Sequence, residues 1–175
     1  MSRLVEELSF RPLTRADLPT LREWMERPHV AEWWSSPGAL ADLEGDYLPS
    51  IEGTDSTQPF IASLHHEAVG FIQVYVVSGS GDGWWESEVD PGARGIDQFI
   101  ADPNRLGQGL GTAMIASFVA RLFSDPAVSK VQADPNPSNR RAIRCYLKAG
   151  FVPVGEVVTP DGPALLMRCE RPTLR

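Results

Sequence analysis

Residues Arg105–Phe123 read RLGQGLGTAMIASFVARLF and join a glycine-rich turn directly to an amphipathic helix. Gly107, Gly109 and Gly111 lack Cβ atoms, so backbone N–H groups at this turn can approach an anion closely. The N-terminus of the helix that follows adds a partial positive charge. Apolar residues recur along that helix over a broad face, which predicts that it lies on a sheet. We therefore expect a strand–turn–helix unit that can hold a phosphate group.

Two common phosphate-binding motifs do not fit this turn. A nucleoside-triphosphate loop needs a lysine followed by Ser or Thr, and no such pair follows the glycines here. The dinucleotide fingerprint GxGxxG follows the first strand of its domain, whereas this turn follows the fourth expected strand and has a different spacing. The turn alone leaves the phosphate ligand open, and a glycine-rich helix entry without a ligand remains an alternative.

Outward from this turn, the chain alternates between strand and helix patterns. Strands are expected at Ser9–Leu13, Pro59–Leu64, Val69–Val77, Gly95–Ile100, Ser129–Ala133, Phe151–Val158 and Ala164–Cys169. Helices are expected after the capping pair Thr14 and Asp17, at Ala39–Leu48 with Pro49 as its stop, after the glycine turn, and at Ser138–Ala149. The order of elements predicts an α/β (α+β) fold with a mixed sheet and helices on both faces.

Length and composition are those of one globular domain. The chain has 175 residues, of which 42% are hydrophobic and 22% charged, so we expect a single domain over residues 1–175 and exclude bulk disorder. The longest apolar stretches are too short to span a bilayer. The segment MSRLVEELSF lacks the apolar core of a signal peptide. A cytoplasmic protein without a membrane partner is therefore expected, with a monomer as the default.

Charge and cysteine usage argue against two further classes of protein. Acidic residues number 23 against 16 basic ones, for a net charge of −7, which is the opposite of a nucleic-acid-binding protein. A field of this sign attracts cations, although solubility explains it equally well. Cys145 and Cys169 have no metal-type spacing with each other or with the histidines, so no metal is expected.

A second motif lies in Asn139–Phe151, which contains the pattern NxxAxxxYxKxGF. Together with LGQGLG at Leu106–Gly111, it resembles the GNAT superfamily of N-acetyltransferases. In that superfamily the glycine turn binds the pyrophosphate of coenzyme A, and two strands beside it splay apart so that the pantetheine arm pairs with the exposed edge. The resemblance implies a single-domain acetyltransferase fold with a mostly antiparallel sheet, in which Gly95–Ile100 and Ser129–Ala133 are the splayed strands.

The same resemblance implies acetyl-CoA as cosubstrate and assigns the residues that bind it. These are Gln98, Ile100, Leu106, Gly107, Gln108, Gly109, Leu110, Gly111, Thr112, Asn139 and Tyr146. Asn139 is expected beside the pantetheine arm. Leu106 departs from the family, which usually has Gln or Arg there, but backbone amides hold the phosphate and the assignment stands.

Longer stretches are similar to one branch of that superfamily, the aminoglycoside 6′-N-acetyltransferases. They are VAEWW (Val30–Trp34), GSGDGWWE (Gly79–Glu86), DPGARGIDQ (Asp90–Gln98), DPNPSNRRAIRCY (Asp134–Tyr146) and TPDGPA (Thr159–Ala164). This resemblance covers nearly the whole chain from Phe10 onward. It implies acetyl transfer from acetyl-CoA to the 6′-amine of an aminoglycoside antibiotic. Siderophore-pathway acyltransferases, which acylate a hydroxylated lysine side chain, are similar more loosely.

An amine acceptor also sets chemical requirements that two residues can meet. A protonated amine must lose a proton before it attacks a thioester, and a carboxylate can accept that proton directly or through water. Asp97, on the strand that lines the splay, is our choice for this general base, with a structural aspartate at a strand bend as the alternative. In this family Tyr146 lies near the sulfur and could protonate the leaving thiolate, unless it only packs on the sheet.

A polycationic acceptor needs carboxylates and flat apolar surfaces. Besides Asp97, we expect Asp82, Asp134 and Asp161 to bind its ammonium groups, although Asp82 could equally be a turn-forming residue. Indole rings suit the apolar face of a sugar and attract cations. Neighbouring residues in an extended chain point in opposite directions, so one tryptophan of each adjacent pair could lie in the core while the other faces the pocket. We favour Trp34 and Trp85 for the pocket.

Two other classes of function remain open on the sequence. One is an acyltransferase for another amine, such as a siderophore precursor or a polypeptide amine. The other is a non-catalytic module that binds coenzyme A or sequesters an aminoglycoside. Retention of Asp97, Tyr146 and the glycine turn argues against the second class.

Overall fold

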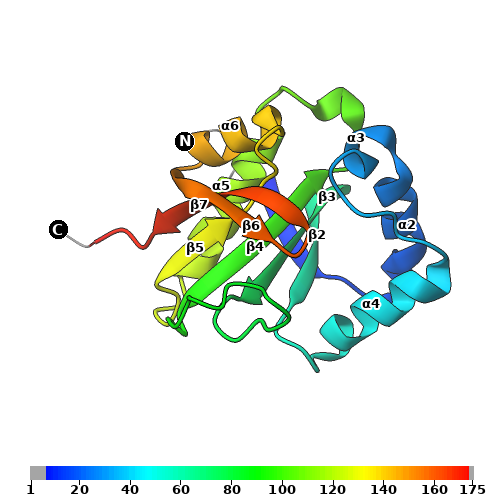
Figure 1. Ribbon diagram of the computed structural model, residues 1–175. Coiled ribbons are helices and arrows are strands. Elements are labelled where there is room, and N and C mark those ends of the chain that lie inside the picture. Colours follow the sequence, from blue (N-terminus) through cyan, green and yellow to red (C-terminus); the bar gives the residue numbers. More distant parts are fainter. Residues whose placement is uncertain (1–6, 174–175) are drawn as a thin grey trace.

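Seven strands form one sheet in the order β1-β2-β3-β4-β5-β7-β6 in the computed structural model, which describes residues 7–173 (Figure 1). The strands are β1 (Leu8–Pro12), β2 (Gln58–Leu64), β3 (Glu67–Val76), β4 (Ala93–Ile100), β5 (Lys130–Ala133), β6 (Val152–Thr159) and β7 (Gly162–Glu170). Neighbouring strands pair antiparallel except for β4 and β5, which are parallel. The expected mixed, mostly antiparallel sheet is therefore confirmed.

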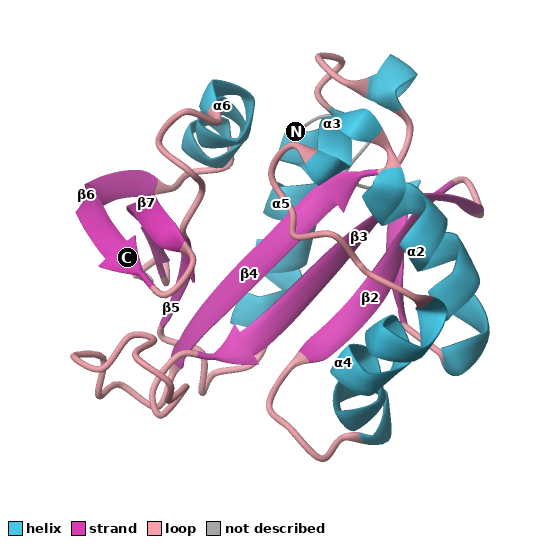
Figure 2. Cartoon of the chain, turned by 45° about the vertical axis from the view of Figure 1, so that its right-hand side comes forward, coloured by secondary structure: helices cyan, strands magenta, loops and turns pink. Residues whose placement is uncertain are grey.

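Helices cover both faces of this sheet (Figure 2). The helices are α2 (Leu18–Glu26), α3 (Pro28–Ala31), α4 (Leu40–Glu52), α5 (Leu110–Phe123) and α6 (Arg140–Lys148), with short 3₁₀ turns at Arg15–Asp17 and Pro103–Arg105. On β3, Phe71 packs in the cluster that includes α2 and α4, whereas Ile72 and Val74 pack in the cluster that includes α5. Successive side chains of a strand point to opposite faces, so these two clusters lie on opposite sides of the sheet.

The splayed pair predicted from the family resemblance is present. Only three positions of β4 and β5 pair, and Gly95 opposite Gln132 is the last of them. Figure 2 shows the two strands close together at one end of β4 and apart toward its other end. Tyr75 of β3 pairs with Gly95 on the other side, and its ring occupies the space that a side chain on Gly95 would need.

One local expectation for the helices was wrong, and one short helix was not predicted. Pro49 does not end the second helix, because α4 continues to Glu52 and ends at Gly53. Pro49 lacks only its own N–H, and Gly53 has a left-handed φ of 73°, which lets the N–H groups of Gly53 and Thr54 bond back to Ser50 and Pro49. The one-turn helix α3, which begins with Pro28, was not predicted because it is shorter than a hydrophobic period can reveal.

The capping expectation at the first helix is confirmed. The backbone N–H and the hydroxyl of Thr14 both donate to Asp17 Oδ2, at 2.8 and 2.9 Å. Arg11 binds the same carboxylate, and this hydrogen bond, helped by those from Thr14 and opposed by burial, lowers the pKa of Asp17 to about 2. Within residues 7–173 there is no helix with the length and apolar character needed to cross a bilayer. The segment MSRLVEELSF, for which no signal peptide was predicted, lies mostly outside the described residues, since these begin at residue 7.

Gly95→Ala should destabilise the protein, because its Cβ would lie 2.1 Å from Cζ of Tyr75. Overpacking of this kind costs about 1–3 kcal/mol of the free energy of unfolding. Gly155→Ala on β6 is the matched control, since no atom outside its own neighbours lies within 4 Å of that added Cβ. Urea unfolding should give a lower midpoint for Gly95→Ala only. Equal midpoints for the two variants would contradict the close packing of Tyr75 on Gly95.

Candidate active site

Two cavities meet beside the splayed end of β4. The first, of 420 Å³, is lined by the glycine turn, the start of α5, one face of α6 and residues of α3. The second, of 890 Å³, is lined by β3, β4, the loop at residues 77–92 and the turn between β6 and β7. Trp33, Trp34, Gln98, Asn139 and Ala142 line both cavities. These shared residues mark where ligands in the two cavities would touch.

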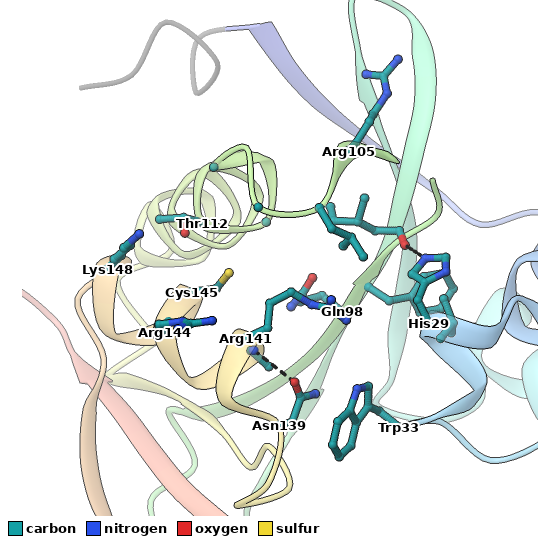
Figure 3. Close-up of a pocket in the computed structure, with 18 of the residues that line it drawn as sticks. His29, Trp33, Gln98, Arg105, Thr112, Asn139, Arg141, Arg144, Cys145 and Lys148 are labelled. Atoms are coloured by element: carbon teal, nitrogen blue, oxygen red, sulfur yellow. Dashed lines mark hydrogen bonds between the residues drawn. The ribbon is translucent and has the colours of Figure 1, made fainter. Parts of the chain in front are cut away.

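The glycine turn forms the wall of the first cavity (Figure 3). Gly107 and Gly109 have φ values of 72° and 84°, a left-handed conformation that glycine adopts without strain. Within α5 the first N–H to bond back to the turn is that of Ala113, which donates to the Gly109 carbonyl at 3.0 Å. The helix therefore leaves the N–H groups of Leu110, Gly111 and Thr112 available to an anion.

Most residues assigned to acetyl-CoA by the resemblance lie on this first cavity. They are Gln98, Ile100, Leu106, Gly107, Gly109, Gly111, Thr112 and Asn139. Leu110 instead points into the core, Gln108 donates a 2.6 Å hydrogen bond to the Asn104 carbonyl, and Tyr146 lines the second cavity. Asn139 is also the N-cap of α6, because its Oδ1 accepts from Ala142 N–H at 3.2 Å.

Cations on the first cavity were missed at the sequence level. Arg141, Arg144 and Lys148 lie on one face of α6 and, with Arg105, line the cavity. Arg105 pairs with Glu67 at 2.6 Å and extends away from the others in Figure 3. Among the described residues no Asp or Glu lines this cavity. The spacing of i, i+3 and i+7 beside the glycine turn was the signal that could have identified the cationic face.

The second cavity has the opposite character. Its carboxylates are Asp46, Asp55, Asp97, Asp134 and Asp161, and within residues 7–173 no Lys, Arg or His lines it. Asp46 on α4 and Asp55 after it were not predicted, because no motif links them to the rest. Asp82 was expected here, but it is exposed in the turn after Gly81 with φ 54° and does not line the cavity. The described chain contains no group of His, Cys, Asp or Glu placed to hold a metal ion.

Asp97 lies on β4 with its side chain in the second cavity. Its Oδ2 accepts a 3.0 Å hydrogen bond from Nε2 of Gln73 on β3. Burial raises the pKa of Asp97, the Gln73 hydrogen bond opposes that rise, and the charge of Asp161 adds to it. A carboxyl group with a raised pKa in a cavity is suited to proton transfer near neutral pH.

Asp134 follows the last residue of β5 and faces the same cavity. Burial raises its pKa to about 8, with further contributions from the negative charges of Asp97 and Asp161. The three carboxyl groups come from three separate parts of the chain, and the charge of Asp161 disfavours ionisation of both Asp97 and Asp134. A bound cation would relieve this repulsion.

Tyr146 of α6 is 4% exposed and lines the second cavity. Its ring packs edge-on against Phe151, with 5.2 Å between ring centroids. Burial, followed by the charges of Asp97 and Asp134, raises its pKa well above the usual value for tyrosine. The phenol therefore keeps its proton at neutral pH and can act as a proton donor.

The tryptophan pairs do not divide into one core and one pocket residue. Trp33 and Trp34 both line the cavities, and Trp34 also packs edge-on against Phe71 and Phe99. Trp84 and Trp85 both line the second cavity. The expected alternation fails because the first pair lies in a turn and Trp85 has a left-handed φ of 50°. Trp85 Nε1 donates to the Tyr75 hydroxyl at 3.1 Å.

Comparison with known proteins identifies the family. The family model described as an acetyltransferase (GNAT) domain matches residues 14–159. Aminoglycoside N(6′)-acetyltransferase type 1 of Klebsiella pneumoniae is 52% identical over 165 residues, which cover 93% of this chain and 82% of the relative. A crystal structure of aminoglycoside acetyltransferase AAC(6′)-Ib with coenzyme A and kanamycin matches with a TM-score of 0.89 and 53% identity, covering 94% of this chain and 95% of that chain.

A more distant relative belongs to another activity class. Lysine N-acyltransferase MbtK of Mycobacterium tuberculosis is 28% identical over 158 residues, which cover 90% of this chain and 74% of the relative. The much higher identity to the aminoglycoside enzymes decides between the two. This chain therefore belongs to the GNAT family of acetyl-CoA-dependent N-acetyltransferases, in the branch of the aminoglycoside 6′-N-acetyltransferases.

Proposed function

We propose that this protein transfers the acetyl group of acetyl-CoA to the 6′-amine of an aminoglycoside and thereby confers resistance to the antibiotic. The observation that carries the proposal is the separation of charge between the two cavities. The first presents cations and backbone N–H groups, and the second presents carboxylates. An anionic acetyl donor and a polycationic acceptor can therefore enter from opposite sides and meet at the shared residues.

On the donor side, the residues present fit acetyl-CoA. The N–H groups at Gly107–Thr112 suit its pyrophosphate, and Arg141, Arg144 and Lys148 supply positive charge for its phosphates. Beyond Gly95 the edge of β4 is unpaired by β5, so its backbone groups are available to the amides of the pantetheine arm. Asn139 lies between the two cavities and is placed to contact that arm.

On the acceptor side, carboxylates replace water around the ammonium groups. Asp97, Asp134 and Asp161 line the same cavity, and Asp46 and Asp55 extend the acidic surface toward α4. The indole rings of Trp33, Trp34, Trp84 and Trp85 provide apolar surface for the sugar rings. We propose that Asp82, which does not line the cavity, affects aminoglycoside binding only through the long-range attraction of its negative charge.

The chemical steps follow from the positions of Asp97 and Tyr146. The Asp97 carboxylate accepts a proton from the 6′-ammonium group, directly or through one water, and leaves a nucleophilic amine. The amine nitrogen bonds to the thioester carbonyl carbon, and a backbone N–H of β4 stabilises the oxyanion that forms. When the carbon–sulfur bond breaks, the Tyr146 phenol donates its proton to the thiolate, and the resulting phenolate takes the second proton from the nitrogen, which forms the neutral amide and restores the phenol. A thiol is acidic enough, with a pKa of about 8.5, that this assistance is modest. The proton held by Asp97 passes to solvent.

The proposal is tested by the choice of acceptor. Purified protein is mixed with acetyl-CoA, and thiol release is followed with a chromogenic disulfide. Three acceptors run in parallel: an aminoglycoside with a 6′-amine, one with a 6′-hydroxyl in its place, and N-hydroxylysine. We expect turnover with the 6′-amine compound and none with the other two. Turnover with N-hydroxylysine alone would move the protein to the siderophore class, and silence with all three would overturn the proposal.

Asp97→Asn should lower kcat by about 10²–10⁴-fold, because the amide cannot accept the proton from the acceptor amine. The KM for acetyl-CoA should be unchanged, since Asp97 does not line the first cavity. Asp125→Asn is the matched control: this residue is exposed in the turn after α5, and its Oδ1 accepts from Ala127 N–H as an amide oxygen also can. Full activity of Asp97→Asn at neutral pH would exclude Asp97 as the base.

Aminoglycoside binding at pH 7 should release up to about one proton from the protein, because an ammonium group favours the ionised form of Asp134. With a pKa of about 8, this carboxyl is mostly protonated in the free protein at pH 7. Titration calorimetry in two buffers of different ionisation enthalpy measures the release. Asp134→Asn should remove most of it and weaken binding by about 10-fold. The same proton count in both proteins would rule out Asp134 as its source.

A further inference from the structure

Gln73 lies directly opposite Asp97 on the neighbouring strand. The register of β3 and β4 pairs the two residues, and both side chains line the second cavity. The neighbours Ile72 and Val74 are buried against α5 on the other face of the sheet, so the alternation of the strand directs Gln73 into the cavity. Its position is therefore fixed by the sheet rather than by a loop.

The surroundings of Asp97 oppose the charge that a general base must carry. Burial removes water from its carboxylate, and the negative charge of Asp161 adds to this effect. In the described part of the chain no Lys, Arg or His lines this cavity to offset that effect. The titratable groups that face Asp97 are Asp134 after β5, Asp161 between β6 and β7, Tyr47 on α4, Tyr75 on β3 and Tyr146 on α6.

The amide of Gln73 is the group that compensates. Its Nε2 donates to Asp97 Oδ2 at 3.0 Å, and a donor to the charged form of a carboxyl group favours that form. A lysine or arginine in the same place would do this more strongly but would repel a polycationic acceptor. A neutral donor stabilises the base and keeps the cavity attractive to cations.

We propose that Gln73 is a positioning residue for acetyl transfer, which holds the Asp97 carboxylate ionised and oriented with Oδ1 toward the acceptor amine. The inference rests on the proposed function, in which Asp97 is the general base. Gln73 itself does not gain or lose a proton in the reaction. Its effect reaches the acceptor through the hydrogen bond to Oδ2.

The first test replaces Gln73 by methionine, which has a similar length and no donor. Without the hydrogen bond the pKa of Asp97 rises, so the carboxylate is lost at a higher pH than in the wild type. The acid limb of the pH profile of kcat/KM should therefore move upward by roughly 1 pH unit. Activity should fall near pH 6 and recover at higher pH, whereas a merely structural defect would lower activity equally at all pH values.

Two further variants separate positioning from packing. Gln58→Met, at the exposed start of β2, is the matched control and should leave the pH profile unchanged. Gln73→Lys should raise the KM for the aminoglycoside by about 10-fold or more through charge repulsion, with the KM for acetyl-CoA unchanged. An unaltered aminoglycoside KM in Gln73→Lys would contradict the requirement for a neutral donor.

A direct titration of Asp97 distinguishes failure of this inference from failure of the proposed function. Carboxyl ¹³C NMR, assigned by the signal missing in Asp97→Asn, reports the pKa of Asp97 without any substrate. A raised pKa in Gln73→Met together with the shifted pH profile supports the inference. If the wild type acetylates the 6′-amine but neither quantity moves in Gln73→Met, the role of Gln73 is overturned and the proposed function stands. If Asp97→Asn keeps full activity, the base and the role of Gln73 are both overturned.

Discussion

Beyond Gly95 and Gln132 the parallel pairing of β4 with β5 stops, and both cavities lie where the two strands have separated. The ring of Tyr75 occupies the space above Gly95 at the last paired position. The hydroxyl of the same tyrosine accepts a hydrogen bond from Trp85, which connects the loop at residues 77–92 to the sheet. The unpaired edge of β4, the position of the loop and the depth of the acceptor cavity therefore depend on one point of strand separation.

Charge is distributed around this separation in a way that the net value of −7 does not reveal. The cations of α6 face the glycine turn, while the carboxylates of five separate positions face the opposite cavity. Because like charges in each cavity repel one another, each arrangement is incomplete without a ligand of opposite sign. The raised pKa values of Asp97 and Asp134 result from gathering these carboxyl groups in a buried cavity before the ligand binds. The boundary between the two fields coincides with the residues shared by both cavities.

The sequence predicted those features that local chemistry determines. The glycine turn, the capping pair of Thr14 and Asp17 and the broad apolar face of α5 each require only neighbouring residues, and all three are present. The separation of β4 from β5 was predicted from the family resemblance, because no local sequence pattern indicates it. Asp46 and Asp55 could not be found in this way, because their place in the cavity depends on how α4 packs on the sheet. Asp82 was assigned from its glycine-rich surroundings, which form a turn that holds it outside the cavity.

The two cavities also differ in the kind of backbone that forms them. The donor cavity is bounded by the N-terminus of α5, the edge of β4 and one face of α6. These three elements also contribute residues to the hydrophobic core. The acceptor cavity takes much of its wall from the loop at residues 77–92, the segment after α4 and the turn between β6 and β7. Substitutions in such exposed connections are tolerated better than changes in packed elements. Under antibiotic selection, the range of accepted drugs can therefore diversify through these connections while the fold and the use of acetyl-CoA are inherited intact.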